Sequence, residues 1–237
     1  MQCDVWWGEA AAYVPWHDTL LDPAERDRRD RYQFPADRAR FAVAAALLRL
    51  VASRMMEVAP ERVRVDRRCD QCGRPHGKPS LGAGAPRVSV SHSGDYVAVA
   101  ACRDAPVGVD VEHGARRTDY RALVSHVLDP AEAPAAGDEA AFLRYWVRKE
   151  ALVKATGDGL GAGLRGIVVT PPGDAPRLLR YRARPGLRAE LRDLAGRPGH
   201  PAAVAVLTSS PLEVAEHDAA PLLRGPGLAT PPRAQQA

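Results

Sequence analysis

A short alternating segment constrains the fold of this chain more than any other feature. In Val107-Gly108-Val109-Asp110-Val111-Glu112, the valines take every second position and the two acids lie between them. This period of two predicts a β-strand with the valines on one face. Asp110 and Glu112 would share the other face, with their backbones about 6.5–7 Å apart. Like charges this close raise each other's pKa unless a cation lies between them, so the pattern predicts a counter-ion.

Further along the chain, the sequence predicts one long helix. Gly137-Asp138 offers a start, Gly157-Asp158-Gly159 ends it, and no proline lies between the two. At about 100° per residue, Glu150 and Lys154 fall inside the apolar arc of this helix, whereas Arg148 falls outside it. Glu150 and Lys154 also have the spacing of a favourable i,i+4 ion pair. That pair is as compatible with a structural ion pair at the rim of the arc as with a functional site.

The acids of the strand and of the helix together form an all-oxygen set. Asp110, Glu112 and Glu150 are too few to fill an octahedron around a metal ion. Magnesium is typically held in this way, by a few carboxylates together with water and the phosphate oxygens of a substrate. Lysines close to such a set suit a phosphate-bearing substrate.

These two segments resemble the paired signature of the 4′-phosphopantetheinyl transferases. The signature consists of Gly-Val-Asp-Val-Glu at 108–112 and Trp-x-x-Lys-Glu-Ala-x-x-Lys at 146–154. The length and single-chain layout resemble the Sfp-type branch of that superfamily. The resemblance has specific motifs over about residues 26–160, and implies an α+β fold. In that fold, two similar α+β halves are related by a pseudo-twofold and the active site lies in the cleft between them.

The resemblance also implies an activity. A transferase of this family moves 4′-phosphopantetheine from coenzyme A to a serine hydroxyl of an acyl or peptidyl carrier protein, and adenosine 3′,5′-bisphosphate leaves. Asp110, Glu112 and Glu150 would hold Mg²⁺. Lys154 and His92 would neutralise the charge that builds on the pyrophosphate oxygens, and Glu150 or a metal-bound water would take the serine proton.

An arginine-rich stretch precedes these motifs. Arg28 lies on a short helix predicted to begin at Asp22-Pro23, and Arg40 lies near the start of a longer helix over about residues 36–56. Most charge runs form a solvated face. The resemblance instead implies that Arg28 and Arg40 bind the 3′-phosphate of coenzyme A.

Two further segments resemble coenzyme-binding motifs of the family. Gly77-Lys78-Pro79 resembles its Gly-Lys-Pro box, and Ser91-His92-Ser93 resembles its Ser-His-Ser motif, whose histidine contacts a coenzyme phosphate. Lys149 lies on a different helical face from Glu150 and is a weaker candidate. The coenzyme-binding residues implied by the resemblance are Arg28, Arg40, Lys78, Pro79, Ser91, His92, Lys149 and Lys154.

Cys69-Asp70-Gln71-Cys72, followed by His76, leaves a zinc knuckle open as an interpretation. A closed zinc site has four ligands, and the nearest later candidates are His92 and Cys102. His92 has the role given above, and Cys102 alternates with apolar residues in a predicted strand. A basic zinc-knuckle module for nucleic acid is therefore an alternative function, but it leaves the three carboxylates unexplained. An inactive coenzyme A-binding homologue is a second alternative, disfavoured because all three acids are present.

Composition bounds the partners and the compartment. The 237 residues carry a formal net charge of +4, which suits an acidic carrier protein and is too mild to argue for nucleic acid. Met1-Gln2-Cys3-Asp4 does not open a signal peptide, and the apolar run 41–52 is too short to span a bilayer. The four cysteines then read as thiols of a reducing compartment. We expect a cytoplasmic monomer that binds no membrane.

The expected halves are residues 1–105 and 106–210. Residues 211–237 are rich in proline and alanine, lack an apolar period, and are expected to form a tail with a mobile end. Strands are predicted at 3–7, on both sides of a Ser93-Gly94-Asp95 turn, and at 166–170, 178–184 and 202–208, with a helix over 118–127.

Overall fold

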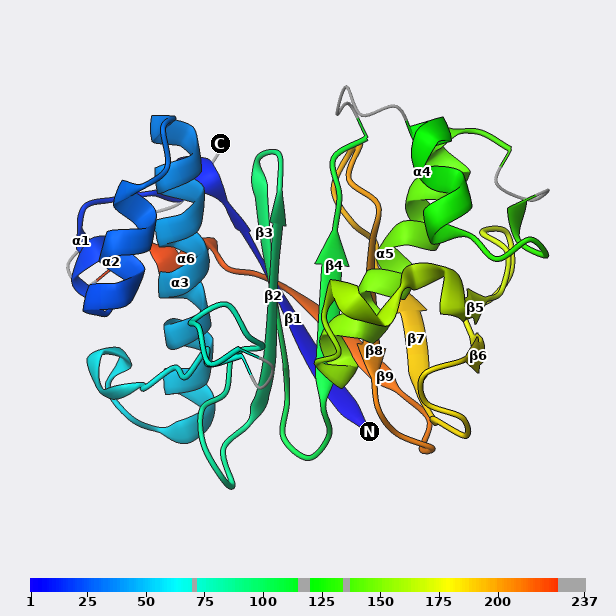
Figure 1. The fold of residues 1–237 in the computed structure, drawn as a ribbon. Helices are drawn as coiled ribbons and strands as arrows, with labels where there is room; N and C mark the ends of the chain where they lie inside the picture. The colour runs from blue at the N-terminus through cyan, green and yellow to red at the C-terminus, as the bar shows by residue number, and fades with distance from the viewer. Residues whose placement is uncertain (70–71, 115–119, 134–136, 226–237) are drawn as a thin grey trace, which may run out of the picture.

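The chain folds into two halves that meet along two neighbouring strands (Figure 1). The structure, a computed structural model, describes residues 1–69, 72–114, 120–133 and 137–225. The first half contains β1 (Gln2–Glu9), η1 (Ala10–Ala12), α1 (Trp16–Thr19), α2 (Pro23–Asp30), α3 (Pro35–Met56), η2 (Pro60–Arg62), β2 (Arg87–Ser93) and β3 (Tyr96–Cys102). The second half contains β4 (Val107–Val111), α4 (Tyr120–Val127), α5 (Glu139–Thr156), η4 (Leu160–Ala162), η5 (Leu164–Gly166), β5 (Ile167–Val169), β6 (Leu178–Tyr181), β7 (Glu190–Asp193) and β8 (Ala202–Val206). The chain then returns to the first half with β9 (Glu213–Asp218) and α6 (Ala220–Leu223).

Each half is built on its own sheet. The first sheet has the order β2-β3-β1-β9, with antiparallel neighbours except for β9, which runs parallel to β1. The second sheet has the order β4-β8-β7 and is antiparallel throughout. A separate antiparallel pair, β5 and β6, completes the second half. Both β2 and β4 are edge strands, and these are the strands that meet where the halves join.

Helices cover the outer faces of the two sheets, and an apolar core fills the space between them (Figure 1). On the outside, α3 packs against β3 in one half and α5 packs against β8 in the other. The core between the sheets combines β1 and β3 of the first half with β4 and β8 of the second. All three valines of the alternating segment, Val107, Val109 and Val111, belong to this shared core, which confirms their predicted common face. The expected α+β class and two-half layout are likewise confirmed.

The opposite face of β4 lies against α5 at close range. A Cβ built on Gly108 would come within 2.0 Å of the Ala151 carbonyl oxygen and 2.4 Å of the Ala155 amide nitrogen. Only a residue without a side chain allows the helix backbone to approach the strand this closely. Because side chains alternate along the strand, the same face carries Asp110 toward the helix.

The predicted helix starts are confirmed by their caps. Asp22 and Glu25 form a reciprocal capping box at the start of α2. Asp138 accepts a hydrogen bond from the Ala141 amide at the start of α5, and Gly157 ends that helix in the left-handed region, with φ of 79°. In the described part of the chain, no helix combines the length and apolarity that a membrane crossing requires.

The predicted tail from residue 211 is wrong in its first part. Residues 213–218 form β9, which adds a parallel strand to the first sheet. The strand shows no apolar period because its side chains form polar pairs with β1: Glu216 accepts from the Trp7 indole at 2.7 Å, and His217 lies 2.7 Å from Asp4. The short strand β7 was also not predicted. The expected mobile end, residues 226–237, lies outside the described residues.

Candidate active site

A row of serine hydroxyls joins the two edge strands. Serines at every second position of β2 accept hydrogen bonds from backbone amides of β4 and of a residue just beyond it, each twenty positions further along the chain. The bonds are Val109 to Ser89 (3.1 Å), Val111 to Ser91 (3.3 Å) and His113 to Ser93 (3.0 Å). The constant offset fixes the register of β4 against β2, and so sets which side chains of the two halves meet.

This register brings each acid of β4 to a serine of β2. The Ser91 hydroxyl donates to Asp110 Oδ1 at 2.9 Å, and the Ser93 hydroxyl donates to Glu112 Oε2 at 3.0 Å. Ser91 is buried, so it positions Asp110 and is not presented to a ligand as the resemblance had implied. The serines therefore hold the two carboxylates on the face of β4 that packs against α5.

Helix α5 contributes the third acid and a lysine to the same place. The Lys154 ammonium lies 2.6 Å from Asp110 Oδ1 and 2.9 Å from the Ser91 hydroxyl. Lys154 thus pairs with an acid of β4, whereas the sequence had suggested Glu150 as its partner. These two bonds use two of the three ammonium protons, and the side chain remains 29% exposed. One turn earlier on α5, Glu150 is buried.

The electrostatics of Glu150 indicate a site that favours a cation. Burial, then the neighbouring Asp110 and Glu112, raise the pKa of Glu150 to about 7, although Lys154 acts in the opposite direction. Asp110 Oδ2 and Glu150 Oε1 are buried without a hydrogen-bond partner. A buried carboxylate oxygen is normally paired, so these two atoms leave room for a positively charged ligand.

The three carboxylates are of the ligand type that a magnesium ion binds, but their oxygens lie too far apart to contact one ion without moving. Carboxylate oxygens are the ligands that Mg²⁺ prefers, and a set of few carboxylates suits an ion that keeps several waters. The ligand oxygens of Asp110, Glu112 and Glu150 do not all lie within 4.8 Å of one another. Among the described residues, three ligand atoms come that close only in a different group of side chains, which is described below. A cation at the acids would have to draw these oxygens inward.

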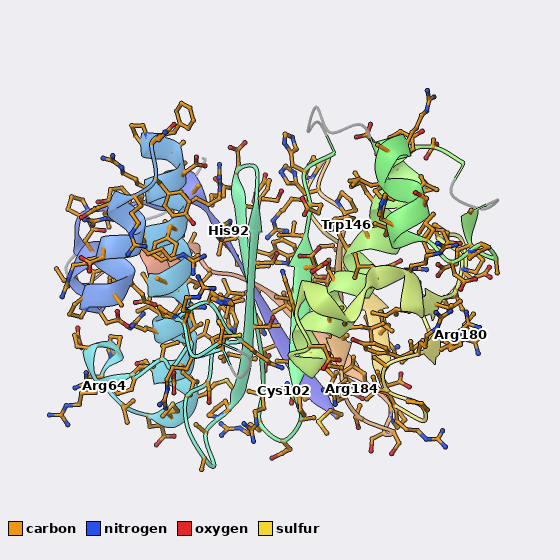
Figure 2. The ribbon with its side chains drawn as sticks, in the orientation of Figure 1. Arg64, His92, Cys102, Trp146, Arg180 and Arg184 are labelled. Carbon is orange, nitrogen blue, oxygen red and sulfur yellow. The ribbon has the colours of Figure 1, made fainter. Side chains whose placement is uncertain are left out.

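A second group of cations lies on the other face of β2. His92 follows Val88 and Val90 on the face that packs against α3, and Figure 2 shows it on that side of the strand. Desolvation by the surrounding protein, then Arg40, Lys154 and Arg28, lower the pKa of His92 to about 4. The His92 ring is exposed and lies near these cations, so a protonated ring would be repelled by them.

Both predicted arginines lie close enough to act on His92. The Arg40 guanidinium donates to the Gly94 carbonyl at 2.6 Å and pairs with Asp37 at 2.6 Å. Arg28 is exposed and its guanidinium lies 5.5 Å from the centre of the Phe41 ring. The start of α3, the end of α2 and the β2–β3 turn therefore form one positively charged region.

Lys78 reaches from the first half to the end of α5. Its ammonium donates to the Ala155 carbonyl at 2.6 Å, one residue beyond Lys154. Desolvation and the nearby Arg87 lower the pKa of Lys78 to about 8. Pro79 comes next in the chain and is half-buried. Lys78 therefore joins the cation-rich surroundings of the acids.

Lys149 is not brought to this site. It is fully buried on another face of α5, where its ammonium lies 2.5 Å from Glu132 and donates to the Val127 carbonyl at 2.7 Å. Arg148 is fully buried as well and binds Asp193 at 2.8 and 2.6 Å. Helix α5 is covered on several sides, so both cations have structural partners, and the suggestion that Lys149 binds coenzyme is wrong.

The Cys-x-x-Cys segment forms a separate cluster. Cys69, Cys72 and His76 place their ligand atoms within 4.8 Å of one another. The possible fourth ligands do not join them: Cys102 is buried beside the Gln2 carbonyl, and His92 belongs to the arginine region.

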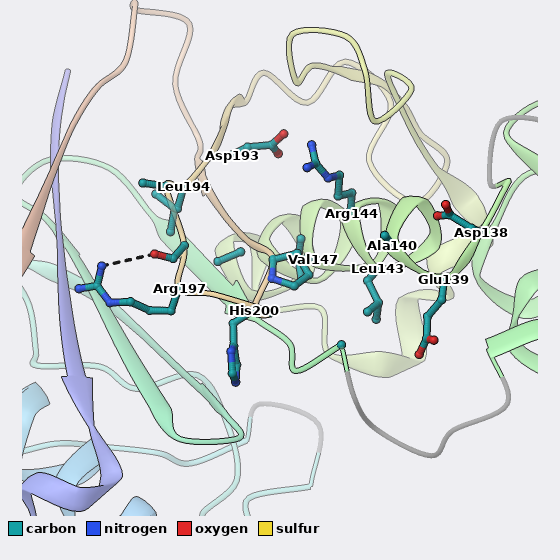
Figure 3. Close-up of a pocket in the computed structure, with 16 residues that line it drawn as sticks. Asp138, Glu139, Ala140, Leu143, Arg144, Val147, Asp193, Leu194, Arg197 and His200 are labelled. Carbon is teal, nitrogen blue, oxygen red and sulfur yellow. Dashed lines mark hydrogen bonds between the residues drawn. The ribbon is translucent and has the colours of Figure 1, made fainter.

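Neither of two cavities in the described part of the chain is lined by Asp110, Glu112 or Glu150. The first, of about 580 Å³, lies between the early turns of α5 and the segment before β8, lined among others by Asp138, Val147 and His200 (Figure 3). The second, of about 550 Å³, lies between Tyr13 and the start of α3. The candidate site is thus identified by two buried carboxylate oxygens that lack a hydrogen-bond partner, on Asp110 and Glu150, and by the converging cations, not by the size of a cavity.

Comparisons with known proteins agree with this geometry. Residues 7–104 match the family model described as "4′-phosphopantetheinyl transferase, N-terminal", and residues 106–205 match that of the 4′-phosphopantetheinyl transferase superfamily. The two matches fall on the two halves of the fold, one on each. The chain belongs to the 4′-phosphopantetheinyl transferase superfamily.

Individual relatives are similar over part of their length. The chain is 30% identical to the 4′-phosphopantetheinyl transferase HetI of Nostoc sp. over 59% of this chain and 61% of that protein. It is 30% identical to psf-1 of Bacillus pumilus, over 66% of each chain, and 37% identical to AcpT of Salmonella typhimurium over 46% of this chain and 56% of that protein. The matched segment therefore spans less than two thirds of these relatives.

Proposed function

We propose that this chain transfers 4′-phosphopantetheine from coenzyme A to a serine hydroxyl of an acyl or peptidyl carrier protein, with Mg²⁺ held by Asp110, Glu112 and Glu150. The observation that carries the proposal is the meeting of the acids of β4 and α5 with Lys154, while two of their buried oxygens lack a partner. The resemblance of the two motifs to the family signature implies that the metal and the pyrophosphate bind at this place.

The reaction joins the serine oxygen to the phosphorus that carries pantetheine. The bond from that phosphorus to the bridging oxygen of the pyrophosphate breaks, and adenosine 3′,5′-bisphosphate leaves with that oxygen. A bound Mg²⁺ would stabilise the charge on the pyrophosphate oxygens. Glu150, or a water molecule beside the acids, would take the serine proton.

The cations of the first half suit the coenzyme. Arg28, Arg40 and His92 form a region that fits the 3′-phosphate, since guanidinium groups bind phosphate oxygens in pairs. Lys154 and Lys78 lie on the α5 side, where the pyrophosphate would lie next to the acids. A low pKa of His92 means that it offers a neutral ring to the free site, and an anionic phosphate would favour its protonated form.

The proposal includes a monomer that works in the cytoplasm. Both halves of the site come from one chain, so no second copy is needed to complete it. All four cysteines are free, which fits a reducing compartment.

The experiment is a mass measurement on a panel of apo carrier proteins. The chain is incubated with coenzyme A, Mg²⁺ and each carrier protein, and the intact masses of the products are determined. We expect at least one carrier to gain the mass of phosphopantetheine, and Asp110→Asn to abolish the gain while retaining the fold. A chain that binds coenzyme A but modifies no carrier would instead be an inactive homologue.

A further inference from the structure

The hairpin between Asp66 and Ser80 carries a second cluster of metal-ligand side chains. Asp66 and Ser80 exchange two backbone hydrogen bonds of 2.8 Å and close the base of the hairpin. Toward its tip, Cys69, Cys72 and His76 have all their ligand atoms within 4.8 Å of one another, and Cys72 Sγ lies 3.0 Å from His76 Nε2. Two thiols and one imidazole are typical zinc ligands.

The backbone of the tip is folded in a way that holds these side chains together. The Gly73 amide donates to the Cys69 carbonyl at 2.7 Å, and the Cys69 amide donates to the Arg74 carbonyl at 2.9 Å. Gly73 adopts a φ of 70°, in the left-handed region that a glycine enters without cost. The tight turn after the second cysteine therefore brings His76 back to the two thiols.

We propose that Cys69, Cys72 and His76 bind a zinc ion, with water in the fourth position of a tetrahedral site. Three protein ligands with water in the fourth position are a known zinc arrangement, found where the ion stays open to solvent. Cys72 and His76 are exposed, so solvent reaches the position that the protein does not fill. The acids on β4 and α5 offer only oxygen ligands, which suit a different metal.

The ion would anchor the segment that carries Lys78 across to α5. The Gly77 amide donates to the Arg67 carbonyl at 2.6 Å, and a Cβ on Gly77 would lie 2.5 Å from the Arg68 carbonyl oxygen. The two arms of the hairpin are thus in close contact right behind His76. Lys78 leaves this point and donates to Ala155. The zinc ion has a positioning role here, not a catalytic one.

The test measures metal content and ligation without coenzyme or carrier protein, so its result is independent of the proposed transfer. The full chain, without a histidine tag, is dialysed and its zinc is quantified by elemental analysis. We expect about one zinc ion per chain. Cobalt substituted into the site should give the thiolate charge-transfer band and the intense d–d bands of a tetrahedral centre.

The variants separate the cluster from the other thiols. Cys72→Ser should weaken zinc binding by at least about 100-fold, since even outer-shell changes cost roughly 10–100-fold. Cys3→Ala removes a thiol of the core between the sheets and should keep the zinc. Because Cys72→Ser could disturb the hairpin, metal-free wild-type protein is also titrated with zinc against a competing chelator.

Three outcomes would overturn the proposal. One is wild-type protein that holds no zinc and gives no cobalt thiolate band. Another is equal zinc content in Cys72→Ser and wild type. The third is wild-type protein as purified in which thiol counting finds Cys69 and Cys72 joined in a disulfide, which would make this a redox pair.

Discussion

Lys154 shows how the site depends on contacts between distant segments. The i,i+4 spacing on the helix suggested Glu150 as its partner, but the structure pairs it with Asp110 at 2.6 Å. Helical spacing identifies neighbours on one helix and says nothing of what lies across from it. The choice of partner depends on the serine row, which sets β4 against β2 and thereby places Asp110 beside Ser91.

Glu150 gives a prediction at the residue scale. Its pKa rises from 4.5 to about 7 on folding, so the folded protein binds the proton more tightly than the unfolded chain. Without divalent metal, the free energy of unfolding therefore falls as the pH rises from about 4.5 to about 7. Above about pH 7 this loss is complete. Glu150→Gln should remove this loss, which is on the order of 3 kcal/mol at most, since each pKa unit corresponds to about 1.4 kcal/mol.

Urea unfolding in a chelating buffer checks this. Glu150→Gln should be more stable than wild type at pH 8 and nearly equal to it at pH 4. Adding Mg²⁺ at pH 8 should stabilise the wild type but not the variant. Identical dependence of the unfolding free energy on pH in the two proteins would show that folding does not raise the pKa of Glu150.

At the scale of elements, the contact between β4 and α5 holds the site. The sequence predicted both elements, the shared face of the two acids, and the helix start at Asp138. It did not reveal why Gly108 lies in the middle of a strand, although an isolated strand glycine is a signal of close backbone approach. Burial of Lys149 could not be predicted either, because a periodic pattern does not show how many sides of a helix are covered.

Gly108 is therefore the residue to change at this scale. Gly108→Ala would press a methyl group to within 2.0 Å of the Ala151 carbonyl oxygen. We expect a loss in free energy of unfolding of about 1–3 kcal/mol or more, because backbone must shift to relieve the contact. Gly173→Ala is the matched control, since nothing lies within 4 Å of its added Cβ. Equal stabilities of the two variants in urea would contradict the close packing of β4 on α5.

At the scale of the whole molecule, neither half holds a complete site. The first half supplies the arginine region, His92 and Lys78, and the second supplies the acids and Lys154. The family motifs predicted this division from sequence. Strand β9 was missed because its polar residues pair with β1 across the sheet, a contact between the two ends of the chain that no local pattern contains.

The arginine region gives a prediction for coenzyme recognition. Arg40→Ala should weaken binding of coenzyme A by about 10–100-fold, since hydrogen bonds to charged groups contribute roughly 1.5–3 kcal/mol. Binding of the form without the 3′-phosphate should change little. Arg62→Ala, an exposed arginine of η2 beyond the other end of α3, serves as the control. Calorimetric titration measures the affinity for both ligands. An equal loss of affinity for the two would show that Arg40 does not bind the 3′-phosphate.

The central claim is that Asp110, Glu112 and Glu150 hold one divalent cation between the halves. Mn²⁺ is the most direct probe, because the electron paramagnetic resonance signal of the free ion decreases as the protein binds it. Titration of the protein with Mn²⁺ in the presence of coenzyme A should show about one site per chain at pH 8, weakened at pH 6 where Glu150 takes up a proton. Asp110→Asn should lose that site, whereas Cys72→Ser should keep it. Unchanged manganese binding by Asp110→Asn would contradict the claim.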